Sequence, residues 1–103
     1  MAKYQIAKGD SFNTELTILD PDGSAQDITG ATITMNIFDR NGDSLHSEAV
    51  TSHTTPLSGI TNIQISKTDT ATFSFGCYNY EIVCVLSSGN ESTVEQGYFE
   101  VTP

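Results

Sequence analysis

The sequence contains no tryptophan, few basic residues and no long hydrophobic run. Four Lys and Arg residues stand against thirteen Asp and Glu residues, which gives a formal net charge of −9. A surface this acidic repels phosphate backbones and anionic lipids, so neither nucleic acid nor a membrane is an expected partner. The first residues show no apolar signal segment, and no run approaches the ~18 apolar residues of a membrane span. The chain is therefore expected to be made and assembled in a cytoplasm.

Cysteine is also scarce: Cys77 and Cys84 lie in what is predicted to be one continuous strand. Seven residues of extended chain would hold them ~23 Å apart, whereas a disulfide needs Cα atoms within ~7 Å. Their odd spacing also places them on opposite faces of the strand. The sequence therefore excludes an intrachain disulfide, and unpaired thiols agree with folding in a reducing compartment.

Helical periodicity is absent, because no window of eleven or more residues shows an i, i+3, i+4, i+7 apolar stripe. Apolar residues instead alternate with polar ones, and turn signals such as Asp20-Pro21-Asp22-Gly23 and Asn41-Gly42 separate the alternating segments. One domain, residues 1–103, accounts for this length. The expected fold is all-β, an immunoglobulin-like antiparallel β-sandwich of about seven strands. The expected strands are 4–8, 12–18, 32–37, 44–51, 60–65, 76–86 and 91–101.

Tyr78 supports the sandwich interpretation. It lies near the start of the penultimate expected strand, where a tyrosine corner has a hydroxyl that bonds to upstream backbone. Tyr80 occupies the place of the second cysteine of an antibody-type domain. Because the sequence has no matching upstream cysteine and no tryptophan, that particular family is excluded.

Apolar residues are expected on the outer faces of the strands next to two hairpins. The last hairpin is expected to pair Val83 with Val94, and the Asn-Gly hairpin to place Phe38 opposite Leu45. An exposed apolar patch on an acidic domain typically marks a docking surface, although loops covering these residues are the alternative. The predicted docking patch consists of Phe38, Leu45, Val83, Val85, Val94 and Tyr98.

The acidic turns resemble metal loops only in part. Asp39, Asn41 and Asp43 have the opening spacing of a calcium loop, but glycine falls at loop position 4 instead of 6 and Val50 replaces the glutamate at position 12. A plain hairpin turn is the preferred interpretation. Asp20-Pro21-Asp22-Gly23 is likewise ordinary turn chemistry.

His46 and His53 are the two histidines of the chain, and along the sequence neither stands near a second obvious ligand. Both are expected at the surface. No Gly-x-Ser-x-Gly elbow and no phosphate-binding loop accompanies them. The sequence therefore predicts no enzymatic activity, no catalytic residues, no cofactor and no metal.

Four segments mark the order of turns and strands along the chain: Leu19-Asp20-Pro21-Asp22-Gly23, Asp27-Ile28-Thr29-Gly30-Ala31, Gly76-Cys77-Tyr78-Asn79-Tyr80 and Gly97-Tyr98-Phe99-Glu100-Val101. This order resembles small immunoglobulin-like structural proteins of tailed bacteriophages, among them the N-terminal domains of baseplate upper proteins. The resemblance covers nearly the whole chain. It implies a non-enzymatic virion protein that docks on a larger symmetric assembly, as a capsid decoration or cement protein or as a tail or baseplate accessory. The implied partners are a major capsid, tail or baseplate protein and further copies of the chain, and the implied location is the virion.

A carbohydrate-binding or host-surface adhesion module is the main alternative. Such a module would use exposed aromatic platforms for sugar stacking, and the sequence offers Tyr4 and Tyr98 for that role but no tryptophan. A domain of a bacterial surface protein is a third possibility, which would normally show a signal sequence or linker.

Overall fold

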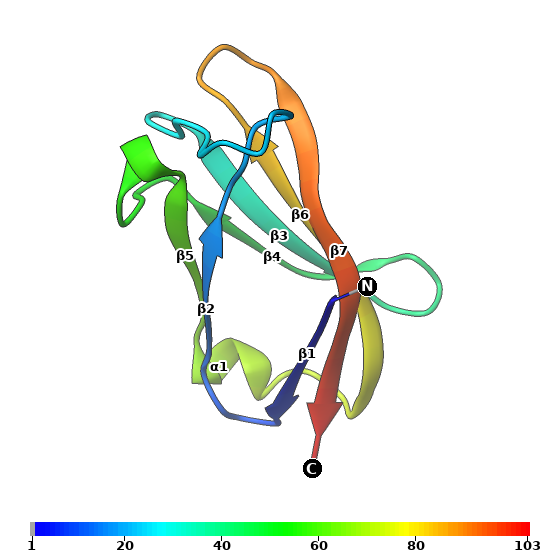
Figure 1. The fold of residues 1–103 in the computed structure, drawn as a ribbon. Coiled ribbons are helices and arrows are strands. Elements are labelled where there is room, and N and C mark those ends of the chain that lie inside the picture. The colour runs from blue at the N-terminus through cyan, green and yellow to red at the C-terminus, as the bar shows by residue number, and fades with distance from the viewer. Residues whose placement is uncertain (1) are drawn as a thin grey trace.

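The computed structural model describes the backbone of residues 2–103 and the side chains of residues 4–103. Seven strands in this part of the chain form two facing sheets (Figure 1). The larger sheet has the order β1-β7-β6-β3-β4, and the smaller sheet pairs β2 with β5. The strands are β1 (Ala2–Ala7), β2 (Phe12–Thr17), β3 (Thr32–Phe38), β4 (Ser44–Val50), β5 (Ile60–Ile65), β6 (Gly76–Val85) and β7 (Glu91–Thr102).

The expected all-β sandwich is confirmed, with one difference in strand direction. Most neighbouring strands are antiparallel, but β1 runs parallel to β7, from Ala2 opposite Gly97 to Ala7 opposite Thr102. A parallel pair needs a long connection between its strands, and here almost the whole domain supplies it. The first and last strands of the described chain are thereby held together at one edge of the larger sheet.

Buried and outward-facing residues alternate along the strands, as expected from the sequence, and the buried ones form the core. In β3, Ile33, Met35 and Ile37 are fully buried, while the residues between them are half-buried on the outer face. Successive side chains of a strand point to opposite faces, so each strand contributes every second residue to the space between the sheets. The buried core consists of Phe12, Ile18, Ile28, Ala31, Ile33, Met35, Ile37, Ile63, Ile65, Phe73, Tyr80, Ile82, Cys84, Phe99 and Val101.

The connections contain two short helical turns, a 3₁₀ turn (Pro56–Ser58) and α1 (Lys67–Thr70). The α1 turn lies where the chain leaves β5 and crosses from the smaller sheet to the larger one (Figure 1). Ser66 caps it, since its hydroxyl accepts a hydrogen bond from the backbone N–H of Asp69 at 3.2 Å. The absence of helical periodicity in the sequence agrees with helical turns this short. None of the helices in the described chain is long and apolar enough to cross a membrane.

The two thiols lie on opposite faces of β6, as their spacing predicts. Cys77 is exposed, Cys84 is buried, and both are free.

Candidate functional site

The inward face of β4 carries two polar side chains next to the core. His46 lies opposite Ile37, and Glu48 lies opposite Met35, across the β3–β4 pair. Directly opposed residues in an antiparallel pair share a face, so His46 and Glu48 point to the same side as these two buried residues. His46 Nε2 and Glu48 Oε1 are 3.0 Å apart, with 18% and 31% of the side chains exposed.

The imidazole of His46 rests on the core through Phe73. The two rings meet edge to face, with centroids 5.6 Å apart, and Phe73 is 1% exposed. An edge-to-face contact with a buried ring fixes the position of the imidazole. His46 therefore stands at a defined place at the boundary between core and solvent.

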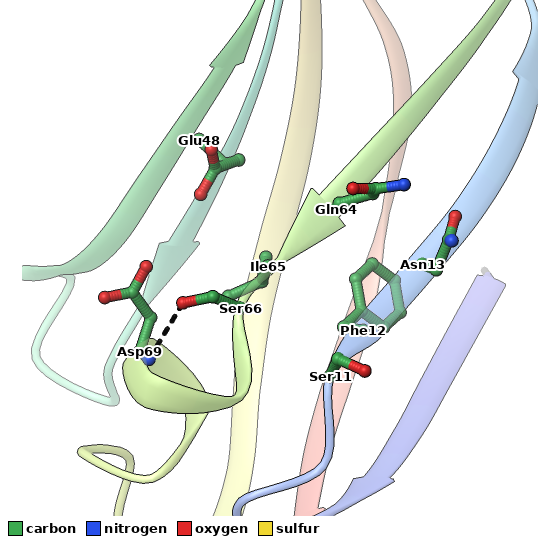
Figure 2. A pocket seen from close by; sticks show the side chains of 8 residues that line it. All are labelled: Ser11, Phe12, Asn13, Glu48, Gln64, Ile65, Ser66 and Asp69. Carbon is green, nitrogen blue, oxygen red and sulfur yellow. Dashed lines mark hydrogen bonds between the residues drawn. The ribbon is translucent and has the colours of Figure 1, made fainter.

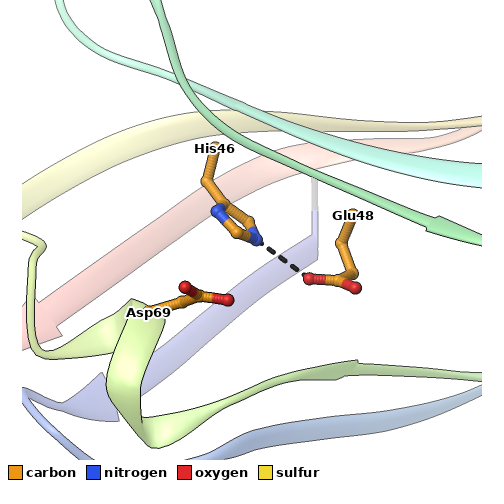
Figure 3. Close-up of side chains that lie close together, drawn as sticks. All are labelled: His46, Glu48 and Asp69. Atoms are coloured by element: carbon orange, nitrogen blue, oxygen red, sulfur yellow. Dashed lines mark hydrogen bonds and ion pairs between the residues drawn. The ribbon is translucent and has the colours of Figure 1, made fainter.

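Asp69 of α1 completes a group of three. One donor atom from each of His46, Glu48 and Asp69 lies within 4.8 Å of the others, and all three side chains are half-buried. Figure 3 shows the imidazole and the two carboxylates converging on a shared space between β4 and α1. One imidazole nitrogen with two carboxylates is a donor set that suits zinc and other divalent first-row transition ions.

The two carboxylates of this group open onto a cleft of about 310 Å³. Figure 2 shows Glu48 and Asp69 on one side of Ser66, with Phe12 and Asn13 on the other. The histidine does not line this cleft. The remaining lining residues are Ser11, Gln64 and Ile65.

His53, in contrast to His46, is held by hydrogen bonds to neighbouring parts of the fold. Its Nδ1 is 2.8 Å from Thr61 Oγ1, and its Nε2 is 2.8 Å from the carbonyl oxygen of Ala31. A carbonyl only accepts, so Nε2 carries the proton, and the Thr61 hydroxyl then donates to Nδ1. Both ring nitrogens are engaged, which leaves His53 no lone pair for a metal.

The expectation that neither histidine lies near a second ligand is wrong for His46. A signal for part of the site was present: residues 46 and 48 are two apart on one strand, so they share a face. In the β3–β4 pair this face points toward the core. Histidine and glutamate are unusual there, because ionisable side chains are rarely buried. Asp69 could not be found this way, because only the packing of α1 against β4 brings it close.

The two acidic segments at Asp20 and Asp39 form the hydrogen-bonded turns that the sequence predicts. Asp39 Oδ1 accepts hydrogen bonds from the backbone N–H groups of Asn41 and Asp43 at 2.9 and 3.0 Å. Asp20 Oδ1 does the same for Asp22 and Ser24 at 3.0 and 3.1 Å. In each turn a carboxylate oxygen satisfies two backbone donors, which is the turn chemistry expected from the sequence.

The structure corrects the strand register behind the predicted docking patch. Val83 pairs with Thr93 instead of Val94, since the register shifts between Ile82 and Val83. Phe38 likewise lies opposite Ser44, not Leu45, because the register shifts between Ile37 and Phe38. A bulge inserts one residue on one strand only, and neither bulge had a sequence signal.

The two bulges divide the predicted patch. Leu45 and Val94 pack against the core, so they are no longer part of an outer face. Val85 and Phe38 are half-buried, and Tyr98 is 44% exposed. Docking through the outer face of the larger sheet stays a prediction.

Tyr78 forms the contact expected of a tyrosine corner. Its hydroxyl donates to the carbonyl oxygen of Ser74 at 2.7 Å, four residues upstream. This hydrogen bond holds the segment that enters β6.

No protein-family model and no curated protein sequence matches the chain. Among solved structures, the chain is similar to CopC from Methylosinus trichosporium OB3b, with a TM-score of 0.57 and 16% sequence identity. The match covers 100% of this chain and 86% of CopC. A likeness at this identity shows a shared β-sandwich fold and nothing finer.

This comparison overturns the expectation of a bacteriophage virion protein. CopC is not a virion component, and nothing in the comparisons points to phage baseplate proteins. The expected roles in a capsid, tail or baseplate and the expected virion location were therefore wrong. They rested on turn and strand order, which unrelated sandwiches share. The predicted lack of catalysis and the docking on other protein copies stay predictions.

Proposed function

We propose that this chain is a small β-sandwich that binds a divalent first-row transition-metal ion through His46, Glu48 and Asp69. The convergence of one imidazole and two carboxylates within 4.8 Å carries the proposal. Zinc and copper(II) are the ions of choice, because both accept imidazole nitrogen and carboxylate oxygen. The net charge of −9 adds a general attraction for cations.

Binding requires a small contraction of the group. Ligand atoms around a tetrahedral zinc ion lie about 3.3 Å apart, because each lies about 2.0–2.2 Å from the metal. The His46–Glu48 distance of 3.0 Å already meets this spacing. Asp69 lines the cleft beside Glu48, and its carboxylate would have to move closer to the other two donor atoms to bind the same ion. The histidine would hold the ion from the core side, and the two carboxylates would hold it from the cleft.

The test is isothermal titration calorimetry of the wild-type protein with Zn²⁺ and Cu²⁺, with Mg²⁺ as a hard-cation comparison. We expect one ion per chain, reversal by a chelator, and preference for the two transition ions over Mg²⁺. His46→Ala should abolish the calorimetric signal. Asp69→Asn should weaken the affinity roughly ten-fold or more, because it removes a charged ligand.

Two variants serve as matched controls. His53→Gln removes the other histidine, whose ring nitrogens are already engaged, and Asp22→Asn removes an exposed carboxylate from a distant turn. Both should bind the ion like the wild type. Stoichiometric binding that survives His46→Ala, or the absence of binding in the wild type, would contradict the proposal.

A further inference from the structure

The three proposed metal ligands belong to two different sheets. His46 and Glu48 lie on β4, the edge strand of the larger sheet. Asp69 lies on α1, which follows β5 of the smaller sheet. A second contact ties α1 to the smaller sheet, because the buried Thr70 hydroxyl donates to the carbonyl oxygen of Asp10 at 2.7 Å, just before β2. An ion held by all three ligands would therefore join the larger sheet to a segment attached to the smaller one.

Strand pairing does not join the sheets on this side of the sandwich. In the part of the chain that the structure describes, β4 pairs with β3 alone and β5 pairs with β2 alone. Two clefts of about 310 and 480 Å³ lie along this side, and Glu48 and Gln64 line both of them. The two sheets are therefore held together here by side-chain contacts, among them the contact of the Phe73 ring with His46.

Without an ion, the charges at this place oppose close contact between β4 and α1. Glu48 and Asp69 each present a carboxylate oxygen, and the two oxygens lie within 4.8 Å of each other. Among the described residues, His46 is the one basic group within ion-pair distance of either carboxylate. Like charges this close repel, and the repulsion is stronger for half-buried groups than in bulk water. A divalent cation between the two carboxylates replaces the repulsion with two attractions.

The α1 turn depends on few contacts of its own. Its backbone hydrogen bonds run from the Thr70 N–H to Ser66 O and from the Ala71 N–H to Lys67 O, both at 3.0 Å. A helix this short is marginal in water by itself, and short exposed segments open locally at a small cost in free energy. A metal bond to Asp69 would have to break before the turn could open, so the ion stabilises the turn.

We propose that the bound ion is a clamp between the two sheets: its binding holds α1 against β4, and its removal lets α1 open. The inference rests on the proposed function, because the same three side chains hold the ion. The Asp69 carboxylate moves toward His46 and Glu48 as the ion binds, which narrows the cleft that Glu48 and Asp69 line. The metal site thereby controls the order of α1.

Amide hydrogen exchange followed by NMR tests the clamp with Zn²⁺, which is diamagnetic. Saturating Zn²⁺ should slow exchange of the Thr70 and Ala71 amides roughly ten-fold or more, because the ion must leave Asp69 before α1 opens. The amides of Gly23 and Gly89 are hydrogen-bonded in turns that line no part of this cleft. Exchange at these two glycines should not change.

Two substitutions in α1 form a matched pair. Asp69→Ala removes the ligand but keeps the backbone N–H that the Ser66 hydroxyl caps, and Zn²⁺ should then leave exchange of the Thr70 amide unchanged. Lys67→Ala removes an exposed side chain of the same turn that is not one of the three ligands. This variant should keep the full effect of Zn²⁺.

The outcomes separate the clamp from the proposed function. Calorimetric binding of one Zn²⁺ that Asp69→Asn weakens, together with unchanged exchange in α1, would overturn the clamp and leave the proposed function intact. Slowing that persists in Asp69→Ala, or that is equally large at Gly23 and Gly89, would also overturn the clamp. Absence of Zn²⁺ binding to the wild-type protein would overturn both.

Discussion

The hydroxyl of Tyr80 donates to Glu95 Oε2 at 3.0 Å, which joins β6 to β7 inside the sandwich. Tyr4 of β1 donates to the same oxygen at 2.8 Å, and the two phenol rings lie 5.1 Å apart. One carboxylate oxygen therefore receives a hydrogen bond from each of two strands. Hydrogen bonds to an ionised acceptor are stronger than neutral ones, so this cluster fastens the edge strand β1 to the larger sheet.

The phenol cluster predicts a loss of stability in alkali. Burial raises the pKa of Tyr80 well above the ordinary value and raises the pKa of Tyr4 as well, and the nearby Glu95 carboxylate adds to both shifts. Because the folded pKa lies above the unfolded one, the stabilisation is complete below pH ~10 and declines as the pH rises beyond it. Urea midpoints measured from pH 8 to 11 should fall.

A double variant provides the control for this pH dependence. Tyr4→Phe, Tyr80→Phe removes both ionisable groups, so it should be less stable at pH 8 but lose less stability than the wild type between pH 8 and 11. Parallel losses in the two proteins would show that the phenols do not cause the effect.

Gly59 is expected to tolerate substitution much less well than Gly42. Its φ is +73°, and an added Cβ would lie 2.5 Å from the carbonyl oxygen of Ile18. Gly42 has a similar φ of +83° with nothing within 4 Å of an added Cβ. Gly42→Ala should lower the free energy of unfolding by ~1 kcal/mol, which is the penalty for a residue with a Cβ at positive φ. Gly59→Ala should cost about 2 kcal/mol more, because a backbone oxygen has to move.

Denaturant unfolding of the two glycine variants measures this difference. Similar free energies of unfolding for the two variants would mean that the backbone near Ile18 shifts to make room for the added Cβ without a loss of stability.

The tyrosine corner should contribute measurable stability. Tyr78→Phe removes the hydrogen bond to Ser74 O and should lower the free energy of unfolding by about 1 kcal/mol. Tyr98→Phe changes an exposed side chain and should stay within about 0.5 kcal/mol of the wild type. Chemical denaturation of both variants tests the pair, and a larger effect at Tyr98 would contradict the assignment.

The two thiols should differ in reactivity. The thiolate is the reactive form, and burial both shields the Cys84 thiol and raises its pKa. Intact-mass measurement after brief treatment with iodoacetamide should show one modification in native protein and two in urea. Cys77→Ser should show none in the native state, and rapid modification of that variant would mean that β6 opens easily.

Much of the architecture was predictable from local pattern. Alternation in 32–37 and 76–86 identifies strands and their inward faces, because a buried face requires every second residue to be apolar. The Asn41-Gly42 turn identifies the β3–β4 hairpin, since glycine there adopts a positive φ. Neither pattern specifies function, and the turn order that suggested a virion protein belongs to many sandwiches.

The sequence by itself determined the strands, the core face of each and the separation of Cys77 from Cys84, because all of these follow from the two-residue period of an extended chain. Only the tertiary structure decided the two bulges, the parallel β1–β7 pair and the meeting of Asp69 with His46. A bulge depends on how neighbouring strands twist and pack. A contact between residues distant in the chain depends on how two sheets close over one core, and no local pattern records that closure.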